Sequence, residues 1–266
     1  MSTQLPKVLI TGASTGIGAT YADRFAHRGH DLVLVARDEA RMRALAERLE
    51  QQTRVDIDIL KADLTAPADL ARVESRVHED ERIGVLVNNA GIATHGSFAN
   101  PDLDDIERLL RLNVTALTRL VGAIVPRYLR QGGGAIINVA SVLALAPEFP
   151  LGAYGATKSY VLALSQNLQS ELGPRGIYVQ AVLPAGTRTE IWERSGRDTK
   201  GLGAMMDVNE MVDAALVGFD RREAVTLPSL PNVDQWQAFD AARRAMLPNF
   251  ANVHPADRYS KEASGR

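Results

Sequence analysis

Cysteine is absent from the 266-residue sequence, which excludes a disulfide scaffold, thiol catalysis and a cysteine-ligated metal site. No run of apolar residues approaches the roughly 20 that a membrane-spanning helix needs. The polar residues 1–7 form too short a stretch for a signal peptide. An excess of one charge is also missing: 30 Lys and Arg residues against 32 Asp and Glu residues give a net charge of −2, so no basic surface for nucleic acid or anionic lipid is expected. We therefore expect a cytoplasmic globular protein with no nucleic-acid or membrane partner.

Short runs of Val, Ile and Leu alternate along the chain with longer segments of helical period. The strands are expected at residues 7–11, 31–36, 56–61, 85–88, 134–140, 178–183 and 224–227. The helices are expected at residues 16–28, 40–52, 68–79, 103–129, 153–172, 208–219 and 233–246. Because the strand runs lack strict in-and-out alternation, they are typical of parallel strands buried on both faces. The pattern predicts an α/β fold, a Rossmann-like doubly wound parallel sheet with helices on both faces and its ligand at the carboxyl edge.

A single domain is expected to span residues 1–266, because no repeat, linker or low-complexity segment divides the chain. Residues 195–206 are glycine-rich and charged, which predicts a surface loop within a substrate loop or cap at about residues 186–210. The polar tail, residues 254–266, is expected to be disordered.

A glycine-rich turn, 11–18, joins the first expected strand to the first expected helix. Gly12 permits the tight turn, Gly16 lets the chain pass close to a pyrophosphate, and Gly18 lets helix and strand approach each other. The N-terminus of the helix adds unpaired N–H groups and a positive dipole end. The spacing is GxxxGxG rather than GxGxxG, and a glycine cluster alone is also compatible with a structural turn, but its place between strand and helix favours nucleotide binding.

The residues that end the second strand favour NADP(H) over NAD(H). A carboxylate there would bind the ribose 2′-hydroxyl of NAD, whereas this chain has Ala36, Arg37 and Asp38. The planar guanidinium of Arg37 suits a phosphate, and Ser14 can assist from the glycine turn. The alternative is that Arg37 and Asp38 only solvate the end of the strand, and Asp38 would weaken the preference for NADP.

Two further strand ends carry residues suited to the rest of a dinucleotide. Asp63 can accept the adenine amino group, and Leu64 can flank the adenine ring. Asn at a strand end is often only a turn former. Here Asn89 is expected to brace the backbone, while Ala90 and Gly91 leave room for the ribose.

Tyr154 and Lys158 are four residues apart in an expected helix, so they share one helical face. Taken alone, this pair is more typical of a half-buried Tyr beside a solvated Lys than of a catalytic pair. Ser141, however, ends the fifth strand at the same sheet edge. Asn113 lies inside an expected helix, where an amide is a poor helix former.

These residues together resemble the short-chain dehydrogenase/reductase family, of the short single-domain type. The matching positions are 11–18, Asp63, Leu64, 88–91, Asn113, Ser141, Tyr154 and Lys158, in the order and spacing of the family. The resemblance covers roughly residues 7–190, and the region beyond the substrate loop is variable in the family. It implies an NADPH-dependent oxidoreductase that reduces a ketone or aldehyde to an alcohol, reversibly, with no metal.

The resemblance assigns a role to each catalytic residue. Tyr154 would be the general acid or base. Lys158 would favour the phenolate electrostatically and bind the nicotinamide ribose. Ser141 would donate a hydrogen bond to the substrate oxygen, and Asn113 would hold a water molecule through its carbonyl.

The expected cofactor-binding residues extend beyond the glycine turn. They are Gly12, Ser14, Thr15, Gly16, Ile17, Gly18, Arg37, Asp63, Leu64, Asn89, Ala90, Gly91, Tyr154, Lys158, Pro184, Gly186, Thr187 and Thr189. The family has Pro-Gly at the turn after the sixth strand, whereas this chain has Pro184 followed by Ala185 and then Gly186. If that turn needs a positive φ, Ala185 would be strained and a turn shifted to Gly186 would cost less.

The expected substrate-binding residues are Ser141, Leu143, Phe149, Tyr154 and Trp192. Leu145, Glu148, Ile191 and His95 are further candidates, and each of them is also compatible with ordinary packing. The glycine-flanked loop 195–206 could exclude water as a lid. The resemblance also implies a homotetramer, or a dimer. The alternative function is a non-catalytic NADP(H)-binding sensor or scaffold, which loss of Ser141, Tyr154 or Lys158 would have supported; all three are present.

Overall fold

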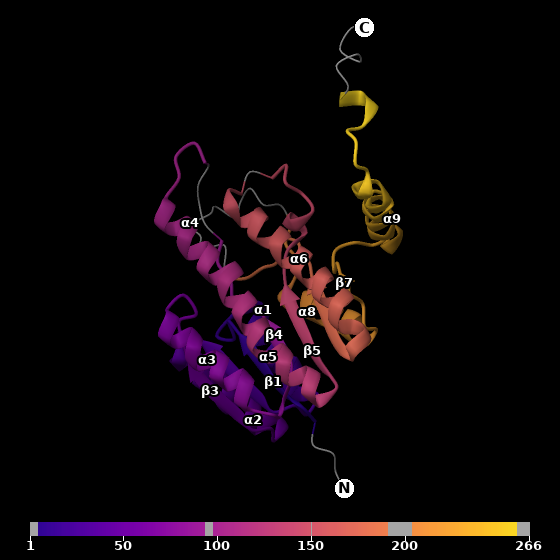
Figure 1. Ribbon diagram of the computed structural model, residues 1–266. Helices are drawn as coiled ribbons and strands as arrows, with labels where there is room; N and C mark the ends of the chain where they lie inside the picture. Colours follow the sequence, from indigo (N-terminus) through magenta and orange to yellow (C-terminus); the bar gives the residue numbers. More distant parts are fainter. Residues whose placement is uncertain (1–4, 94–97, 150, 191–203, 260–266) are drawn as a thin grey trace. The chain divides into compact units, whose positions relative to one another are not determined.

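The computed structural model describes residues 5–93, 98–149, 151–190 and 204–259. It divides into two compact units, Met1–Ser229 and Leu230–Arg266, which are taken separately below. Figure 1 shows the course of the chain in both units.

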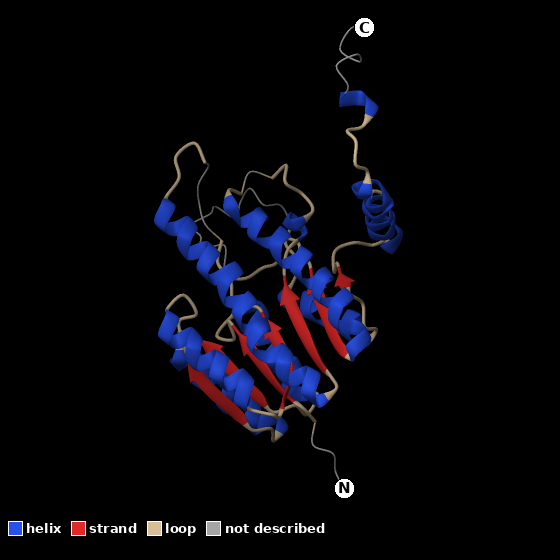
Figure 2. Cartoon of the chain, viewed as in Figure 1, coloured by secondary structure: helices blue, strands red, loops and turns tan. Residues whose placement is uncertain are grey.

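A parallel sheet of seven strands forms the centre of the first unit (Figure 2). The strands are β1 (Lys7–Thr11), β2 (Leu32–Ala36), β3 (Ile57–Lys61), β4 (Ile83–Asn88), β5 (Gly134–Val139), β6 (Ile177–Val182) and β7 (Val225–Thr226). Their order in the sheet is β3-β2-β1-β4-β5-β6-β7, and every neighbouring pair is parallel. The chain moves outward from β1 to β3 and then returns to pair β4 with the other side of β1. This reversal opens a crevice at the carboxyl ends of β1 and β4, where open α/β sheets bind ligands.

Burial explains why the strands read as continuous apolar runs. The strands β1, β2 and β6 are buried along their whole length, because helices cover both faces of the sheet. The edge strand β3 is half-buried instead, and it includes the charged residues Asp58 and Lys61. The predicted doubly wound parallel sheet is confirmed.

Helices pack on both faces of the sheet (Figure 1). They are α1 (Gly16–His27), α2 (Glu39–Thr53), α3 (Pro67–Glu79), α4 (Leu103–Leu110), α5 (Leu117–Gln131), α6 (Ala153–Leu172) and α8 (Val208–Asp220). Helix α1 contacts α2 and α8, whereas α3 contacts α5 and α4 contacts α6. The observed helices agree with the ranges predicted from the sequence periodicity, and their ends differ from the predicted ends by at most two residues.

The helix predicted at residues 103–129 is not a continuous α-helix. Between α4 and α5 lies a π-helical segment, η1 (Arg111–Ala116), which contains Asn113. A π-helical turn shifts the hydrogen-bonding pattern by one residue, and such turns are frequent at functional sites. Asn113 lies within this segment, and it is buried.

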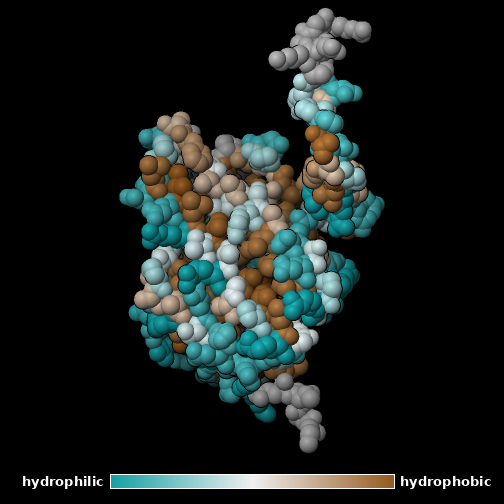
Figure 3. All heavy atoms as spheres, in the orientation of Figure 1, coloured by the Kyte–Doolittle hydropathy of each residue, from teal (hydrophilic) through white to brown (hydrophobic). Residues whose placement is uncertain are grey.

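The combined helix Leu103–Gln131 is long and apolar enough to cross a membrane by length and composition. The core helix of a sheet protein passes the same test, and Leu120, Ile124 and Tyr128 of this helix are buried. Apolar side chains are also visible on the outer surface over α4 to α6 in Figure 3, and Leu103, Leu110 and Tyr160 of these helices are exposed.

The second unit contains α9 (Val233–Ala245) and two short 3₁₀ segments, η5 (Leu247–Ala251) and η6 (Asp257–Tyr259). Helix α9 confirms the predicted helix at residues 233–246. None of these three elements buries a residue within the described part of the chain. The predicted single domain over residues 1–266 stays a prediction. The tail 254–266 is expected to be disordered, but its residues 257–259 form η6, while residues 260–266 lie outside the described residues.

Candidate active site

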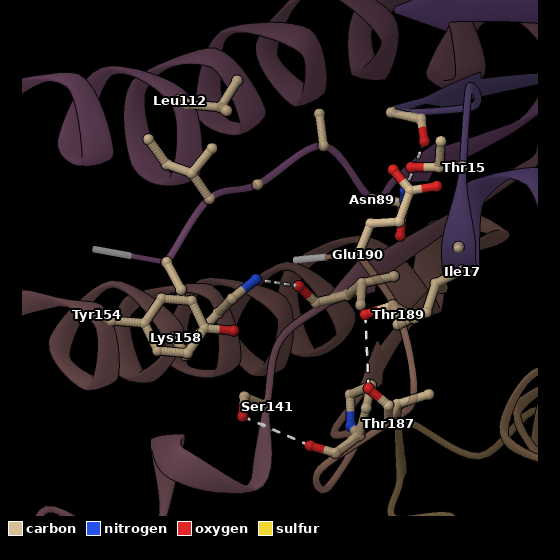
Figure 4. A pocket seen from close by; sticks show the side chains of 18 of the residues that line it. Thr15, Ile17, Asn89, Leu112, Ser141, Tyr154, Lys158, Thr187, Thr189 and Glu190 are labelled. Atoms are coloured by element: carbon tan, nitrogen blue, oxygen red, sulfur yellow. Dashed lines mark hydrogen bonds between the residues drawn. The ribbon is translucent and has the colours of Figure 1, made fainter. Parts of the chain in front are cut away.

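A cavity of about 820 Å³ opens at the carboxyl edge of the sheet. Its walls come from the segments that follow β1 to β6, with Tyr154 and Lys158 of α6 on one side (Figure 4). This size lies in the range of cofactor and drug-sized ligand sites. The cavity brings together all the predicted site residues that the structure describes except Gly18 and Asn113, which lie behind its wall.

The glycine turn has the backbone geometry that its residues predict. Gly12 and Gly16 have φ values of +67° and +54°, a left-handed conformation that favours glycine. A Cβ on Gly12 would lie 2.8 Å from Asn89 Nδ2, and a Cβ on Gly18 would collide with the carbonyl oxygen of Gly12. Thr15 precedes α1 without a side-chain hydrogen bond to the helix N-terminus. The first N–H groups of α1 are therefore left without a side-chain cap beside the cavity, as an anion site requires.

Asn89, the residue directly after β4, holds this turn in place. Its Nδ2 donates hydrogen bonds to the carbonyl oxygens of Thr11, at 3.0 Å, and Gly12, at 3.2 Å. The Oγ1 of Thr11 accepts in return from the N–H groups of Asn89 and Ala90, both at 3.0 Å. The predicted bracing role of Asn89 is thus present as a two-way connection between β1 and β4.

At the far end of the cavity, Arg37 presents a largely exposed guanidinium. The Arg37 side chain is 64% exposed, and its Nη1 lies 3.9 Å from Asp63 Oδ2, beyond hydrogen-bond distance. Asp38, which could have favoured a ribose hydroxyl, instead caps α2 by accepting a hydrogen bond from the N–H of Arg41 at 3.1 Å. Asp63 accepts hydrogen bonds from the N–H and hydroxyl of Thr65. The guanidinium of Arg37 is the group that this end offers to a ligand.

Tyr154, Lys158 and Ser141 lie together at the opposite end (Figure 4). Lys158 Nζ is 5.6 Å from the centroid of the Tyr154 ring and donates a hydrogen bond to the carbonyl oxygen of Val139 at 2.8 Å. Ser141 accepts from the N–H of Leu143 at 3.2 Å and donates to the carbonyl oxygen of Pro184 at 3.4 Å. The Ser141 hydroxyl is also a hydrogen-bond partner of Tyr154.

Burial governs the protonation of this group. It raises the pKa of Tyr154 to about 12, and the hydrogen bond from Ser141 opposes that rise only in part. Burial also lowers the pKa of Lys158 to about 8. Lys158 is predicted to favour the phenolate form of Tyr154, and that role stays a prediction, because burial is the main influence on the pKa of both side chains.

Asn113 supports the wall rather than lining it. Its Nδ2 donates to the carbonyl oxygen of Ile92 at 2.9 Å and to Thr157 Oγ1 at 3.2 Å, while its Oδ1 accepts from the N–H of Ile92 at 3.0 Å. A Cβ on Gly91 would lie 3.2 Å from Asn113 Oδ1 and 3.6 Å from Lys158 Nζ. Asn113 therefore joins η1, α6 and the segment after β4, and its predicted water-holding role stays a prediction.

The turn after β6 accommodates Ala185 without strain. Neither Ala185 nor Gly186 has a positive φ, so the shifted turn considered for Gly186 is not needed. Thr187 Oγ1 donates to the carbonyl oxygen of Ala185 at 3.0 Å. The Cβ and methyl group of Thr189 lie against Gly16, 3.2 Å from the position a Cβ there would take. Both threonines line the cavity, and their contact with the cofactor stays a prediction.

The substrate end is mostly apolar. Leu143 and Phe149 line the cavity as predicted, whereas Leu145 and Glu148 are not among its described lining residues. His95, Ile191 and Trp192 lie outside the described residues. Sequence reasoning missed the lining residues Ile92, Ala93, Arg108, Leu112, Val142, Leu151 and Glu190. Several of them are next to predicted site residues in the sequence, and that proximity could have identified them as lining residues.

Comparison with known proteins gives concordant matches. A family model described as short chain dehydrogenase matches residues 6–200. A short-chain dehydrogenase from Sphingobium yanoikuyae, solved in complex with NADPH, is 59% identical with a TM-score of 0.94, covering 96% of this chain and 100% of that one. The bulky-bulky ketone specific alcohol dehydrogenase from Comamonas testosteroni is 53% identical with a TM-score of 0.90, covering 97% and 99%. Sulfoacetaldehyde reductase 2 from Chromohalobacter salexigens is 33% identical, covering 89% of this chain and 98% of that protein.

Proposed function

Because this chain belongs to the short-chain dehydrogenase/reductase family of oxidoreductases, we propose that it is an NADP(H)-dependent carbonyl reductase, equivalently an alcohol dehydrogenase. The observation that carries the proposal is a single cavity with a glycine-rich anion site and Arg37 at one end and with Ser141, Tyr154 and Lys158 at the other. A non-catalytic NADP(H) sensor would not need the second group.

The residues present fit the cofactor. The left-handed Gly12 and Gly16 and the uncapped N-terminus of α1 form a cradle for a pyrophosphate. Arg37 suits the 2′-phosphate, since the competing carboxylate of Asp38 is engaged in capping α2. The Sphingobium yanoikuyae dehydrogenase, with 59% identity, was solved with NADPH, which supports NADP(H) for this chain.

The side chains at the other end divide the remaining chemistry. When bound, the reduced nicotinamide supplies the hydride. Tyr154 is neutral near pH 7, because its pKa is raised to about 12, and so it can donate its proton to a carbonyl oxygen. Ser141, whose bond to Pro184 is long, can turn its hydroxyl toward the same oxygen as negative charge develops there. Lys158, with a pKa of about 8, is mainly an ammonium ion at neutral pH and provides a positive charge beside the phenol.

The substrate class follows from the walls at this end. Leu143, Phe149 and Leu151, together with Ile92 and Leu112, present apolar surface to the cavity. Such a lining favours a hydrophobic ketone or aldehyde, or the corresponding alcohol, over a sugar or a polyol. The likeness to the Comamonas testosteroni enzyme, which is specific for bulky-bulky ketones, supports the same class.

We also propose that the protein is a cytoplasmic homo-oligomer, a tetramer or a dimer. The exposed Leu103, Leu110 and Tyr160 lie on the helices that flank Asn113 and Tyr154. Apolar surface at these helices suits an interface between copies.

Substitution of Tyr154→Phe tests the proposed function. The variant keeps the ring but loses the proton donor, so we expect ketone reduction to fall roughly a hundredfold or more, with NADPH affinity unchanged. Loss of NADPH absorbance across a panel of hydrophobic ketones measures the rate, and calorimetry measures the affinity.

A matched control is Tyr160→Phe on the same helix, since Tyr160 is exposed and its hydroxyl bonds Thr118 at 2.9 Å, outside the cavity. We expect it to retain wild-type turnover. Full turnover in Tyr154→Phe would contradict the assigned proton donor, and NADPH binding without oxidation by any ketone would favour the sensor.

A further inference from the structure

An ion pair joins two segments at the rim of the cavity. Nη1 of Arg41, in the first turns of α2, lies 2.9 Å and 2.7 Å from Oε1 and Oε2 of Glu190. The two residues are 149 positions apart in the sequence. Glu190 lines the cavity, on the side formed by Thr15, Ile17 and Asn89 and away from Tyr154 (Figure 4). The guanidinium of Arg41 is therefore one hydrogen bond away from the cavity wall.

At the Arg37 end of the cavity, anionic side chains lie beside the cationic ones, and these anionic groups would repel a phosphate dianion. Arg37 and Arg41 are cationic, whereas Asp38, Asp63 and Glu190 are anionic. Asp38 and Asp63 accept hydrogen bonds within their own turns, from the N–H of Arg41 and from Thr65 respectively, and Asp63 Oδ2 also lies 3.9 Å from Arg37 Nη1. The carboxylate of Glu190 is paired with the guanidinium of Arg41 from a different element, and a ligand anion can replace a carboxylate as the partner of that guanidinium.

Arg37 and Arg41 stand on either side of Asp38 in the sequence, and Asp38 lines the cavity together with Arg37. Arg37 follows β2, and Arg41 follows the cap residue Asp38, whose Oδ2 lies 3.4 Å from Arg41 Nε. The contact with Asp38 fixes the stem of the Arg41 guanidinium and leaves its Nη1 directed to Glu190. A phosphate beside Arg37 would compete with Glu190 for that Nη1, and a dianion attracts a guanidinium more strongly than a carboxylate does.

We propose that Arg41 is a second specificity-determining residue for the 2′-phosphate of NADP(H). In this proposal the 2′-phosphate replaces the carboxylate of Glu190 as the partner of the Arg41 guanidinium. NADP(H) binding exchanges the Arg41–Glu190 pair for an Arg41–phosphate pair. NAD(H), which has a 2′-hydroxyl, leaves the pair intact. This inference rests on the proposed function, because it requires that the cavity binds NADP(H).

The exchange makes a distinct prediction for each partner. Removal of Arg41 weakens binding only of ligands that carry the 2′-phosphate. Removal of the negative charge of Glu190 frees Arg41 in advance and strengthens binding of the same ligands. The second effect requires Arg41, whereas simple repulsion between Glu190 and the phosphate would not.

Calorimetric titration with adenosine 2′,5′-bisphosphate and with adenosine 5′-monophosphate tests this without any turnover. In Arg41→Ala we expect affinity for the bisphosphate to fall about tenfold and affinity for the monophosphate to change less than about twofold. Arg41→Lys should restore part of the loss, since it keeps the charge but not the planar fork. Glu190→Gln should raise bisphosphate affinity severalfold and leave monophosphate affinity unchanged.

The control is Arg43→Ala, which removes the same charge from the same helix. Arg43 pairs with Glu39 at the surface, is 62% exposed and is not among the described residues that line the cavity. We expect wild-type affinity for both nucleotides. In the double variant Arg41→Ala with Glu190→Gln, the gain caused by Glu190→Gln should disappear.

The outcomes separate this inference from the proposed function. A wild-type protein that binds the bisphosphate no better than the monophosphate would overturn the NADP(H) proposal itself. A wild-type preference for the bisphosphate that Arg41→Ala retains in full would overturn only the role of Arg41. A gain from Glu190→Gln that persists in the double variant would overturn the exchange.

Discussion

At the scale of single residues, the same burial acts on Tyr154 and Lys158 in opposite senses. It disfavours the charged form of each, so the pKa of the phenol rises to about 12 and that of the ammonium falls to about 8. Near neutral pH the site thus holds a protonated acid beside a cation that is close to losing its charge. Carbonyl reduction requires a protonated Tyr154 beside a cationic Lys158, and the pair is in this state near neutral pH.

The pH dependence of the free enzyme should follow Lys158. As pH rises through about 8, Lys158 loses its charge while Tyr154 stays protonated. We therefore expect kcat/KM for NADPH to fall above that pH, because this parameter reports groups of the free enzyme. Rate measurements from pH 6 to about 10 check the position of the decline.

Two variants identify the group responsible for this decline. Lys158→Arg should abolish it, at a lower overall rate, because a guanidinium stays protonated throughout the range. Ser141→Ala should leave its position unchanged. The hydrogen bond from Ser141 lowers the pKa of Tyr154, so its removal raises that pKa. If Tyr154 caused the decline in rate, Ser141→Ala would therefore move the decline to higher pH.

At the scale of elements, the connection between β1 and α1 must satisfy two geometric requirements. The strand must turn tightly at Gly12, and the helix must start close enough for its N–H groups to reach the cavity. Gly18 meets the second requirement by lying directly against the carbonyl of Gly12 and the amide of Asn89. The turn therefore depends on the absence of a side chain at a position that does not itself line the cavity.

A pair of glycine variants tests this dependence. Gly18→Ala forces a Cβ against backbone atoms of Gly12, so we expect a loss of roughly 1–3 kcal/mol in the free energy of unfolding, with weaker NADPH binding. Gly122→Ala, on the exposed side of α5, meets no atom within 4 Å and should raise the free energy of unfolding by about 0.5–1 kcal/mol. Urea unfolding followed by circular dichroism measures both. Equal effects of the two substitutions would refute the tight contact at Gly18.

At the scale of the whole molecule, the cavity belongs entirely to the first unit. Every described residue that lines it precedes residue 191, whereas the second unit begins at Leu230. Within the described part of that second unit, α9, η5 and η6 bury no residue. We therefore expect the sheet and its cavity to form without the second unit.

Removal of the residues after Ser229 should leave the site intact. We expect the shortened chain to bind NADPH within about twofold of the full chain and to unfold within ~4 °C of it. Calorimetry and thermal unfolding check these values. Light scattering on both chains gives their oligomeric state, for which a tetramer or a dimer is predicted. Loss of NADPH binding in a shortened chain that is folded would show that the site needs the second unit.

The sequence alone was sufficient for features that depend on near neighbours. The ends of β1 at Lys7 and Thr11 and of α6 at Ala153 and Leu172 agree with the predicted ranges. Period and glycine placement are local, and the repeated order of strands and helices leaves few alternatives to a doubly wound sheet. The glycine turn and the set Ser141, Tyr154 and Lys158 could be found for the same reason.

Only the tertiary structure decided what depends on residues far apart in the chain. The π-helical turn at Asn113 is accompanied by bonds to Ile92, 21 residues away, and the pairing of Arg41 with Glu190 spans 149 residues. The opposite pKa shifts of Tyr154 and Lys158 arise from burial among surrounding segments. Such contacts form only when the sheet brings distant strand ends to one edge, and no local pattern encodes their distances or their desolvation.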